Sequence, residues 1–185
     1  MTNQNDRATL LKIAREAVAA HVTGVAQAFR PAMPDDLASR LGGAFVSVHH
    51  HGDLRGCIGY IAADRRLTEV IAQCAVSACS ADPRFRPVSE SELADVDIEL
   101  SLLGPLLPIS GPDEIEIGRH GLVVELDRSR GLLLPQVATE WKWDALTFFA
   151  QTCRKAGLPA DAWKLGASVW KFEAEVFGEN AKRET

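Results

Sequence analysis

A hairpin that carries a glycine-flanked cysteine constrains this chain more than any other feature. Residues 44–51 have the composition of a strand, and residues 51–53 (His-Gly-Asp) supply a turn. The returning strand then reads Leu-Arg-Gly-Cys-Ile-Gly-Tyr over residues 54–60. Glycine weakens a strand because it adds backbone entropy and packs no side chain, so it marks a bulge, a bend or the close approach of a ligand or another backbone. The two glycines therefore predict a special backbone site around Cys57.

Cys57 is the candidate nucleophile at this site. Nucleophilic catalysis by cysteine needs a thiolate, a base that accepts the proton and an oxyanion site. Arg55 could favour the thiolate electrostatically, and the backbone bared by Gly56 and Gly59 could face a developing anion. The residues that could serve as the base or as its orienting carboxylate are His49, His51, His120, Glu99 and Asp53. The alternative is a small buried residue beside a kink in the sheet, since free cysteine is among the most buried residue types.

The composition limits the class of protein. With 185 residues and 46% hydrophobic content, the chain suits one compact domain, residues 1–185. A net charge of −5 argues against generic nucleic-acid binding, which needs a basic surface. No apolar stretch reaches the roughly 18 residues of a membrane-spanning helix, and the polar N-terminus lacks a signal-peptide core. The four cysteines lack CxxC spacing, which favours reduced thiols and a cytoplasmic location.

Hydrophobic periodicity predicts an α+β fold with a mainly antiparallel sheet and helices packed on one face. Apolar residues recur at helical spacing in three stretches, and they alternate with polar residues in several others. Residues 104–135, rich in Pro and Gly at their start, could form a smaller lobe. Besides the hairpin, the predicted helices are residues 7–28, 67–80 and 143–156, and the predicted strands are residues 95–103, 122–126, 131–134 and 170–177. The strands at 122–126 and 131–134 are predicted to form a second hairpin, joined by residues 127–130 (Asp-Arg-Ser-Arg).

The three consecutive histidines at residues 49–51 raise a metal alternative. Alternate residues of a strand point the same way, so His49 and His51 could bind one metal ion. A third ligand would have to be His120 or Cys57. A solvated strand end beside a turn explains the run more simply, and we expect neither a metal site nor a cofactor.

A binding module without catalysis is the other alternative. A groove beside a glycine-kinked strand could receive a peptide or the strand edge of a partner. The residues that would contact the ligand there are Leu54, Gly56, Ile58, Gly59 and Arg84. The tryptophans among polar residues could add anchors, namely Trp141, Trp143 and Trp163.

Several ordered segments carry a family resemblance. They are the LRGCIGY strand, the run Asp-Pro-Arg-Phe at residues 82–85, GLLLPQVA at residues 131–138, Trp-Asp at residues 143–144 and Lys-Ala-Gly-Leu at residues 155–158. Together they resemble the AMMECR domain family, called protein A of the AmmeMemoRadiSam system in prokaryotes. The resemblance implies an α+β fold with a larger and a smaller subdomain, and partnership with a Memo-like protein and a radical S-adenosylmethionine (radical SAM) protein.

The resemblance implies no particular reaction, so two hypotheses stand. The first is an enzyme or enzyme component that uses Cys57, with support from Arg55, a histidine such as His120, and Glu99. The second is a non-catalytic adaptor whose groove beside the LRGCIG strand binds a partner.

Overall fold

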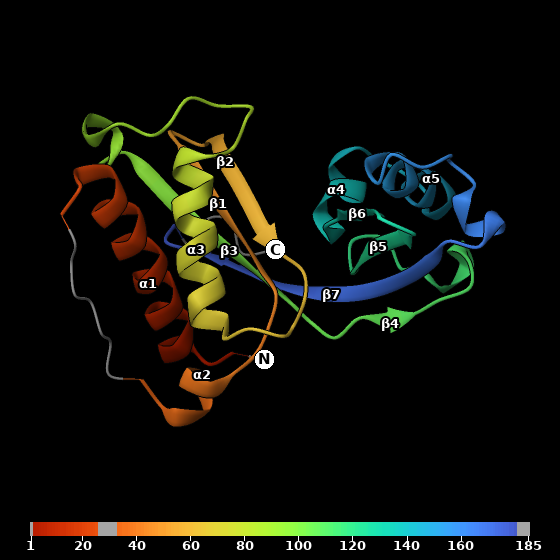
Figure 1. Cartoon of the computed structure of the whole chain (residues 1–185), viewed down its shortest axis with the longest axis horizontal. Coiled ribbons are helices and arrows are strands. Elements are labelled where there is room, and N and C mark those ends of the chain that lie inside the picture. Colours follow the sequence, from red (N-terminus) through yellow and green to blue (C-terminus); the bar gives the residue numbers. More distant parts are fainter. Residues whose placement is uncertain (1, 26–32, 181–185) are drawn as a thin grey trace. The chain divides into compact units, whose positions relative to one another are not determined.

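The computed structural model describes residues 2–25 and 33–180 and divides the chain into two compact units. The first unit comprises residues 1–103 and 175–185, and the second comprises residues 104–174. Strand β7 (Ser168–Gly178) runs from the second unit into the first (Figure 1). The second unit begins at Gly104, where the sequence suggested a smaller lobe, and it continues beyond residue 135 to include the following helices.

The first unit is built on an antiparallel sheet in the order β2-β1-β3-β7. The predicted hairpin is present as β1 (Ala44–His50) and β2 (Asp53–Tyr60), and β3 (Val96–Leu103) pairs with β1 on its other side. Because β1 lies between them, β2 is an edge strand. The pairing of β1 with β2 is irregular between Val48 and His49, so the two strands contain a bulge there.

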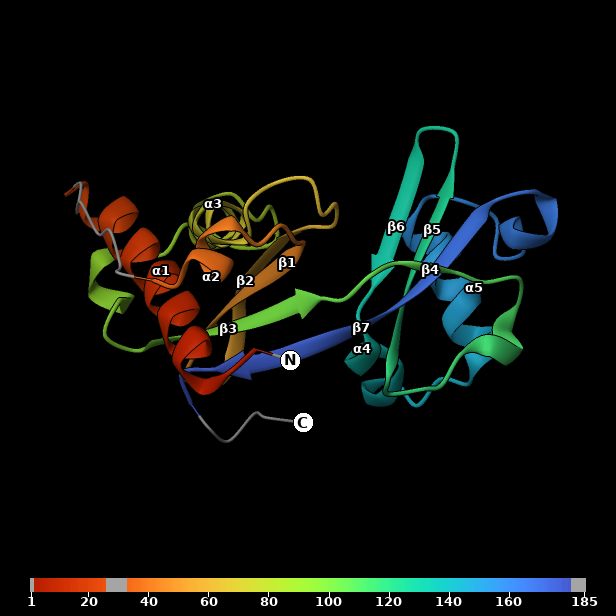
Figure 2. The same ribbon diagram turned by 90° about the horizontal axis from the view of Figure 1, so that it is seen from below.

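Three helices pack on one face of this sheet (Figure 2). They are α1 (Gln4–Thr23), α2 (Asp35–Ser39) and α3 (Leu67–Ser80), and α3 has the predicted bounds. The predicted helix 7–28 instead begins after the N-cap Asn3, whose side chain accepts from the Asp6 amide, and ends before the left-handed Gly24. Residues 26–28 of that prediction lie outside the described residues.

Alternate residues of the strands form the core under these helices. The fully buried side chains that meet there include Leu10, Val18, Val46, Val48, Leu67, Ile71, Ile98 and Leu100. Strand alternation therefore sends Ser47, Cys57 and Glu99 to the opposite face of the sheet.

The second unit has its own core. Strands β5 (His120–Leu126) and β6 (Ser129–Leu133) form the second predicted hairpin, and β5 and β4 (Leu107–Pro108) each pair with β7. Helix α5 (Ala145–Lys155) corresponds to the predicted helix 143–156, whereas α4 (Pro135–Glu140) was not predicted. The buried residues of this core are Leu122, Val124, Ala138, Phe148, Phe149, Cys153, Ala162 and Val169.

Short 3-10 helices complete the chain, at Glu90–Glu92 (η1), Pro112–Glu114 (η2) and Ala162–Leu165 (η3). The mixture of helices and antiparallel strands confirms the predicted α+β class. Among the described residues, no helix is long and apolar enough to span a membrane.

Candidate functional site

The Cys57 side chain belongs to a row of polar groups that crosses three strands. The strand register places Ser47 of β1 opposite Cys57 of β2 on one side and opposite Glu99 of β3 on the other. Side chains directly opposite one another on the same face of an antiparallel sheet are neighbours. Ser47 Oγ donates a hydrogen bond to Cys57 Sγ at 3.3 Å. We call Cys57, Ser47 and Glu99 the Cys57 row.

The surroundings of Cys57 favour a neutral thiol. Burial raises the pKa of this thiol, and the negative charges of Asp82 and Glu99 raise it too. The hydrogen bond from Ser47 and the positive charge of Arg84 lower it, but the net pKa remains above the ordinary value. A cysteine that serves as a resting nucleophile usually shows the opposite shift, because the thiolate is the reactive form.

The backbone amide of Cys57 is engaged by Asp82. The amide donates to Asp82 Oδ2 at 2.9 Å, across the outer edge of β2. The Asp82 carboxylate is buried and also receives the backbone amide and the guanidinium of Arg84, whose nearest nitrogen lies 2.7 Å away. The hydrogen bond from the Arg84 side chain is the largest cause that holds the pKa of Asp82 well below its usual range. The Cys57 amide therefore donates to a carboxylate of the protein itself. In an oxyanion site, this amide would instead have to point towards a bound substrate.

The two glycines beside Cys57 serve internal packing. A Cβ atom on Gly56 would lie 2.0 Å from the carbonyl oxygen of Ala78, so the glycine lets α3 approach the strand. A Cβ atom on Gly59 would lie 2.3 Å from the ring of Phe45, its cross-strand neighbour. An aromatic ring that covers a strand glycine is a known way to stabilise such a strand. Gly56 thus shows the close approach of another backbone that the sequence allowed for, whereas at Gly59 the close neighbour is a side-chain ring.

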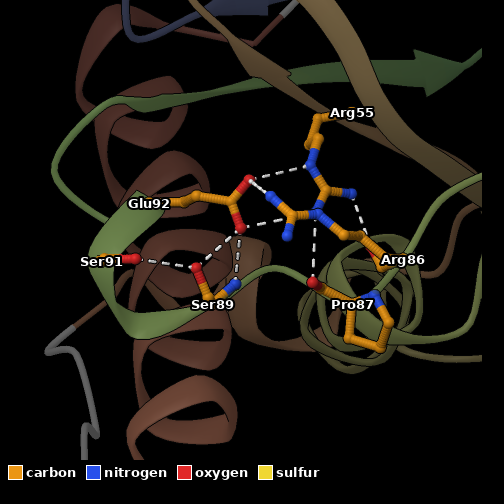
Figure 3. A network of polar contacts seen from close by, with 6 residues as sticks. All are labelled: Arg55, Arg86, Pro87, Ser89, Ser91 and Glu92. Carbon is orange, nitrogen blue, oxygen red and sulfur yellow. Dashed lines mark hydrogen bonds and ion pairs between the residues drawn. The ribbon is translucent and has the colours of Figure 1, made fainter.

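Arg55 forms hydrogen bonds with the loop of residues 86–92, which lies along the edge of β2 (Figure 3). Its Nε donates to Glu92 Oε1 at 3.1 Å, and its terminal nitrogens donate to the carbonyls of Arg86 and Pro87. Glu92 also accepts from the amide and hydroxyl of Ser89. These hydrogen bonds, the Ser89 amide first, lower the pKa of Glu92 to about 2. The contacts of Arg55 thus lead to the 86–92 loop, and this loop covers the edge at which a partner strand would add.

Asp82 and Ser47 are the site residues that the sequence analysis did not single out. Asp82 lies 25 residues after Cys57 and is fixed by the tertiary fold. The signal for it was the Asp-Pro-Arg-Phe run itself, in which a carboxylate and a guanidinium are two positions apart. Ser47 could have been found by pairing the two strands of the hairpin around the turn, which sets it opposite Cys57.

The other predicted site residues lie in different surroundings. His120 belongs to the second unit, where its Nδ1 accepts from the Glu116 amide and burial lowers its pKa. Ile58 packs against the core under α3, and Leu54 is partly exposed. Trp163 packs edge-on against Phe149 in the second core. Within the first unit, the residues gathered around Cys57 are Ser47, Asp82, Arg84 and Glu99.

Comparison with known proteins assigns the family. The sequence model of AMMECR1 matches residues 11–177. The chain belongs to the AMMECR1 family. A protein of Methanothermobacter thermautotrophicus is 42% identical and aligned over 96% of both chains, and one of Methanococcoides burtonii is 39% identical over 97% of this chain and 92% of its own. The crystal structure of an uncharacterized protein from Pyrococcus horikoshii matches with a TM-score of 0.85 and 37% identity, covering 96% of this chain and 93% of that one.

Two of the segments that suggested the AMMECR1 family meet at the candidate site. The LRGCIG strand contributes Cys57, and the Asp-Pro-Arg-Phe loop contributes Asp82 and Arg84. The hydrogen bond between the Cys57 amide and Asp82 joins them directly. In this AMMECR1 chain the two motifs therefore build one local structure.

Proposed function

We propose that this AMMECR1 chain is a binding component of a system that carries out a modification reaction, acting with a Memo-like and a radical SAM protein, and that the Cys57 row receives the ligand or partner. The observation that carries the proposal is the state of Cys57. Its thiol pKa is raised and its amide is bound by Asp82, so the residue resembles a recognition group more than a resting nucleophile.

The chemistry of the row suits recognition of a polar group. On the sheet face opposite α1 and α3, Ser47 supplies a hydroxyl that is buried and already bonded to Cys57, and Glu99 supplies a half-buried carboxylate. Arg84 adds a guanidinium whose side chain is about half exposed and whose positive charge acts on Cys57. A ligand at this row would meet hydrogen-bond donors and acceptors of both charges, an arrangement that provides orientation and specificity.

The face of the sheet is a better candidate surface than its edge. The edge of β2 is covered at Arg55 and Cys57 by the residues 82–92 that bind them. Addition of a partner strand there would have to displace the ion pair between Arg55 and Glu92, which is costly because the two side chains are each only 11% exposed. We therefore refine the adaptor hypothesis, and place binding at the Cys57 row.

An enzyme centred on Cys57 is the second candidate, and one contact favours it. Ser47 donates its hydrogen bond to Sγ, which stabilises a thiolate relative to a thiol. If a bound partner withdrew Asp82 or Glu99 from the thiol, the same hydrogen bond would help to activate it. Such a mechanism needs an acid–base group that the bound state supplies.

Complementation with Cys57→Ser separates the two candidates. A strain of the host organism that lacks this gene would be compared with its parent for altered proteins and metabolites, then supplied with wild-type or variant chains. Under the binding proposal, Cys57→Ser restores the parental profile, because serine nearly preserves size and keeps a group that can donate and accept hydrogen bonds. Under the nucleophile hypothesis it fails, since an unactivated serine hydroxyl is far less nucleophilic than a thiolate. Failure by a folded, normally abundant Cys57→Ser chain would reject the binding proposal.

A second measurement addresses the partners. The purified chain would be titrated with the Memo-like and radical SAM proteins of the same organism by calorimetry. We expect Glu99→Gln to weaken the association at least about tenfold if the row is the contact surface, as loss of a charged interface group does. Glu140→Gln, a change at an exposed carboxylate of the second unit, is the matched control and should bind as the wild type does. Equal binding by all three chains would remove the row from the interface.

A further inference from the structure

We propose that His50, His51 and Asp95 form a divalent metal site at the tip of the β1–β2 hairpin, of the kind that takes Zn²⁺ and keeps open positions for water. One ligand atom from each of the three side chains can be chosen so that all three lie within 4.8 Å of one another. Two imidazoles and one carboxylate form a ligand set that suits zinc and its neighbours in the first transition row. This site is separate from the Cys57 row and does not depend on the function proposed for it.

The turn explains how two consecutive histidines come to the same place. In a regular strand, His50 and His51 would point to opposite faces. Here His51 has φ +52° and Gly52 has φ +97°, which gives a two-residue turn with left-handed backbone at both positions. The His50 and His51 rings consequently lie with their centroids 4.1 Å apart.

The left-handed backbone of His51 costs conformational energy that a glycine at this position would not pay. Left-handed conformation disfavours residues with a Cβ by about 1–2 kcal/mol, and glycine or asparagine is the common choice in such turns. Strain of this kind, once observed, is a reason to look for a function at the residue. The exposed imidazole of His51 could bind a metal ion together with His50 and Asp95, and this is a function that would account for the strain.

The strand register supplies the third ligand. His50 pairs with Asp53 across the hairpin and with Val96 of β3 on its other side, so the residue before Val96 lies beside the turn. That residue is Asp95, 44 positions after His51 in the sequence. The metal alternative considered from sequence required His120 or Cys57 as the third ligand, and the tertiary fold provides a carboxylate instead.

The backbone around Asp95 is held in place before any ion binds. The Asp95 amide donates to the carbonyl of Glu92 at 3.0 Å. On either side of Asp95, Arg15 donates to the carbonyls of Leu93 at 3.2 Å and Val96 at 2.7 Å. A ligand presented by a fixed backbone loses less conformational freedom on binding, which supports affinity.

The geometry fits an open site. Tetrahedral ligands with bonds of about 2.1 Å lie about 3.4 Å apart, so small rotations of these side chains suffice to close on an ion. His51 and Asp95 are exposed and His50 is half-buried, which leaves the remaining coordination positions to water. Three protein ligands plus water is the pattern of reactive or exchangeable zinc, whereas structural zinc has four protein ligands.

Calorimetric titration of the tag-free protein with Zn²⁺ tests the proposal. We expect one equivalent to bind in wild type and an affinity at least about tenfold lower in His51→Asn and in Asp95→Asn. Asparagine tolerates the left-handed turn, so His51→Asn removes the imidazole without adding backbone strain. His21→Asn, at an exposed histidine of α1, is the matched control, and Cys57→Ser excludes a thiol ligand. Both should bind as the wild type does.

Thermal unfolding provides an independent readout, because an ion that binds only the folded state raises the melting temperature. Zn²⁺ should raise it for the wild type and His21→Asn and should have less effect on His51→Asn and Asp95→Asn. Absence of a one-equivalent site in the wild type would overturn the proposal. Unchanged affinity in Asp95→Asn would overturn it as well, because two adjacent histidines would then account for the binding.

Discussion

At the scale of single residues, Cys57 and its neighbouring glycines show what a local motif can and cannot predict. The LRGCIG pattern indicated unusual backbone packing, and the contacts of Gly56 and Gly59 bear this out. It could not indicate that Asp82 takes the Cys57 amide or that burial raises the pKa of the thiol. Those properties arise from residues distant in sequence, and only the tertiary fold brings them to Cys57.

The raised pKa of Cys57 predicts slow reaction with iodoacetamide at pH 7. The reaction should be slower than that of N-acetylcysteine, because less thiolate is present, and it should accelerate as pH rises above 9. Cys57 should still be labelled before the buried Cys74, Cys79 and Cys153. Mass spectrometry of timed reactions with native protein measures both orders. If Cys57 were labelled faster than N-acetylcysteine, the hypothesis that Cys57 is an activated nucleophile would be supported instead.

Gly56→Ala tests the packing role of this glycine. The added Cβ would meet the Ala78 carbonyl at 2.0 Å, so the strand or α3 must move, and we expect a loss of about 2–3 kcal/mol in the free energy of unfolding. Gly42→Ala is the control, because its Cβ would make only an ordinary contact of 3.5 Å with Leu67. It should change the free energy by less than about 0.5 kcal/mol. Urea unfolding measures both values, and equal effects would disprove the packing role.

At the scale of elements, local patterns predicted what local sequence determines. The apolar stripe of α3 gave its bounds correctly, and turn residues located both hairpins. Helix α4 was missed because it has six residues, too few to show a periodicity, and begins with Pro135. The contact of the 86–92 loop with the edge of β2 could not be predicted from local sequence either, because Arg55 and Glu92, which make it, are 37 positions apart.

The hydrogen bonds that Glu92 accepts, from the Ser89 amide first and then from Arg55, should make part of the stability depend on acid pH. The folded-state pKa of Glu92 is about 2 against an ordinary 4.5, so its contribution is complete above about pH 4.5 and is lost as the pH falls towards 2. Glu92→Gln should therefore destabilise the protein at pH 6 by about 1–2 kcal/mol, after allowance for solvent screening, and by less at pH 3. Chemical unfolding at the two pH values measures the difference.

The neighbouring Glu90→Gln serves as the control for this acid effect. Glu90 is exposed at the start of η1, so its removal should leave the pH dependence as in the wild type. A Glu92→Gln variant with the same loss of stability at pH 6 and pH 3 would show that the ionised Glu92 carboxylate does not carry the effect.

At the scale of the whole molecule, β7 connects two units that each have a core. Phe177 of this strand packs in the first core and Val169 in the second. The boundary between the units falls within the strand, between Ala174 and Glu175. Loss of either core therefore removes packing from the same strand, and we expect the two units to unfold together.

Two optical probes can test this cooperativity, because each reports on a different unit. All four tryptophans lie in residues 104–174, so their fluorescence follows the second unit, whereas α1 and α3 of the first unit contribute much of the helical circular dichroism. Urea unfolding should give coincident transitions by the two probes. Ile71→Ala, which truncates a fully buried residue of α3, should destabilise the protein by about 2–4 kcal/mol and lower the midpoint seen by tryptophan fluorescence as well. Leu146→Ala, at an exposed residue of α5, should move neither midpoint. If Ile71→Ala shifts the dichroism alone, the units unfold independently and β7 does not couple them.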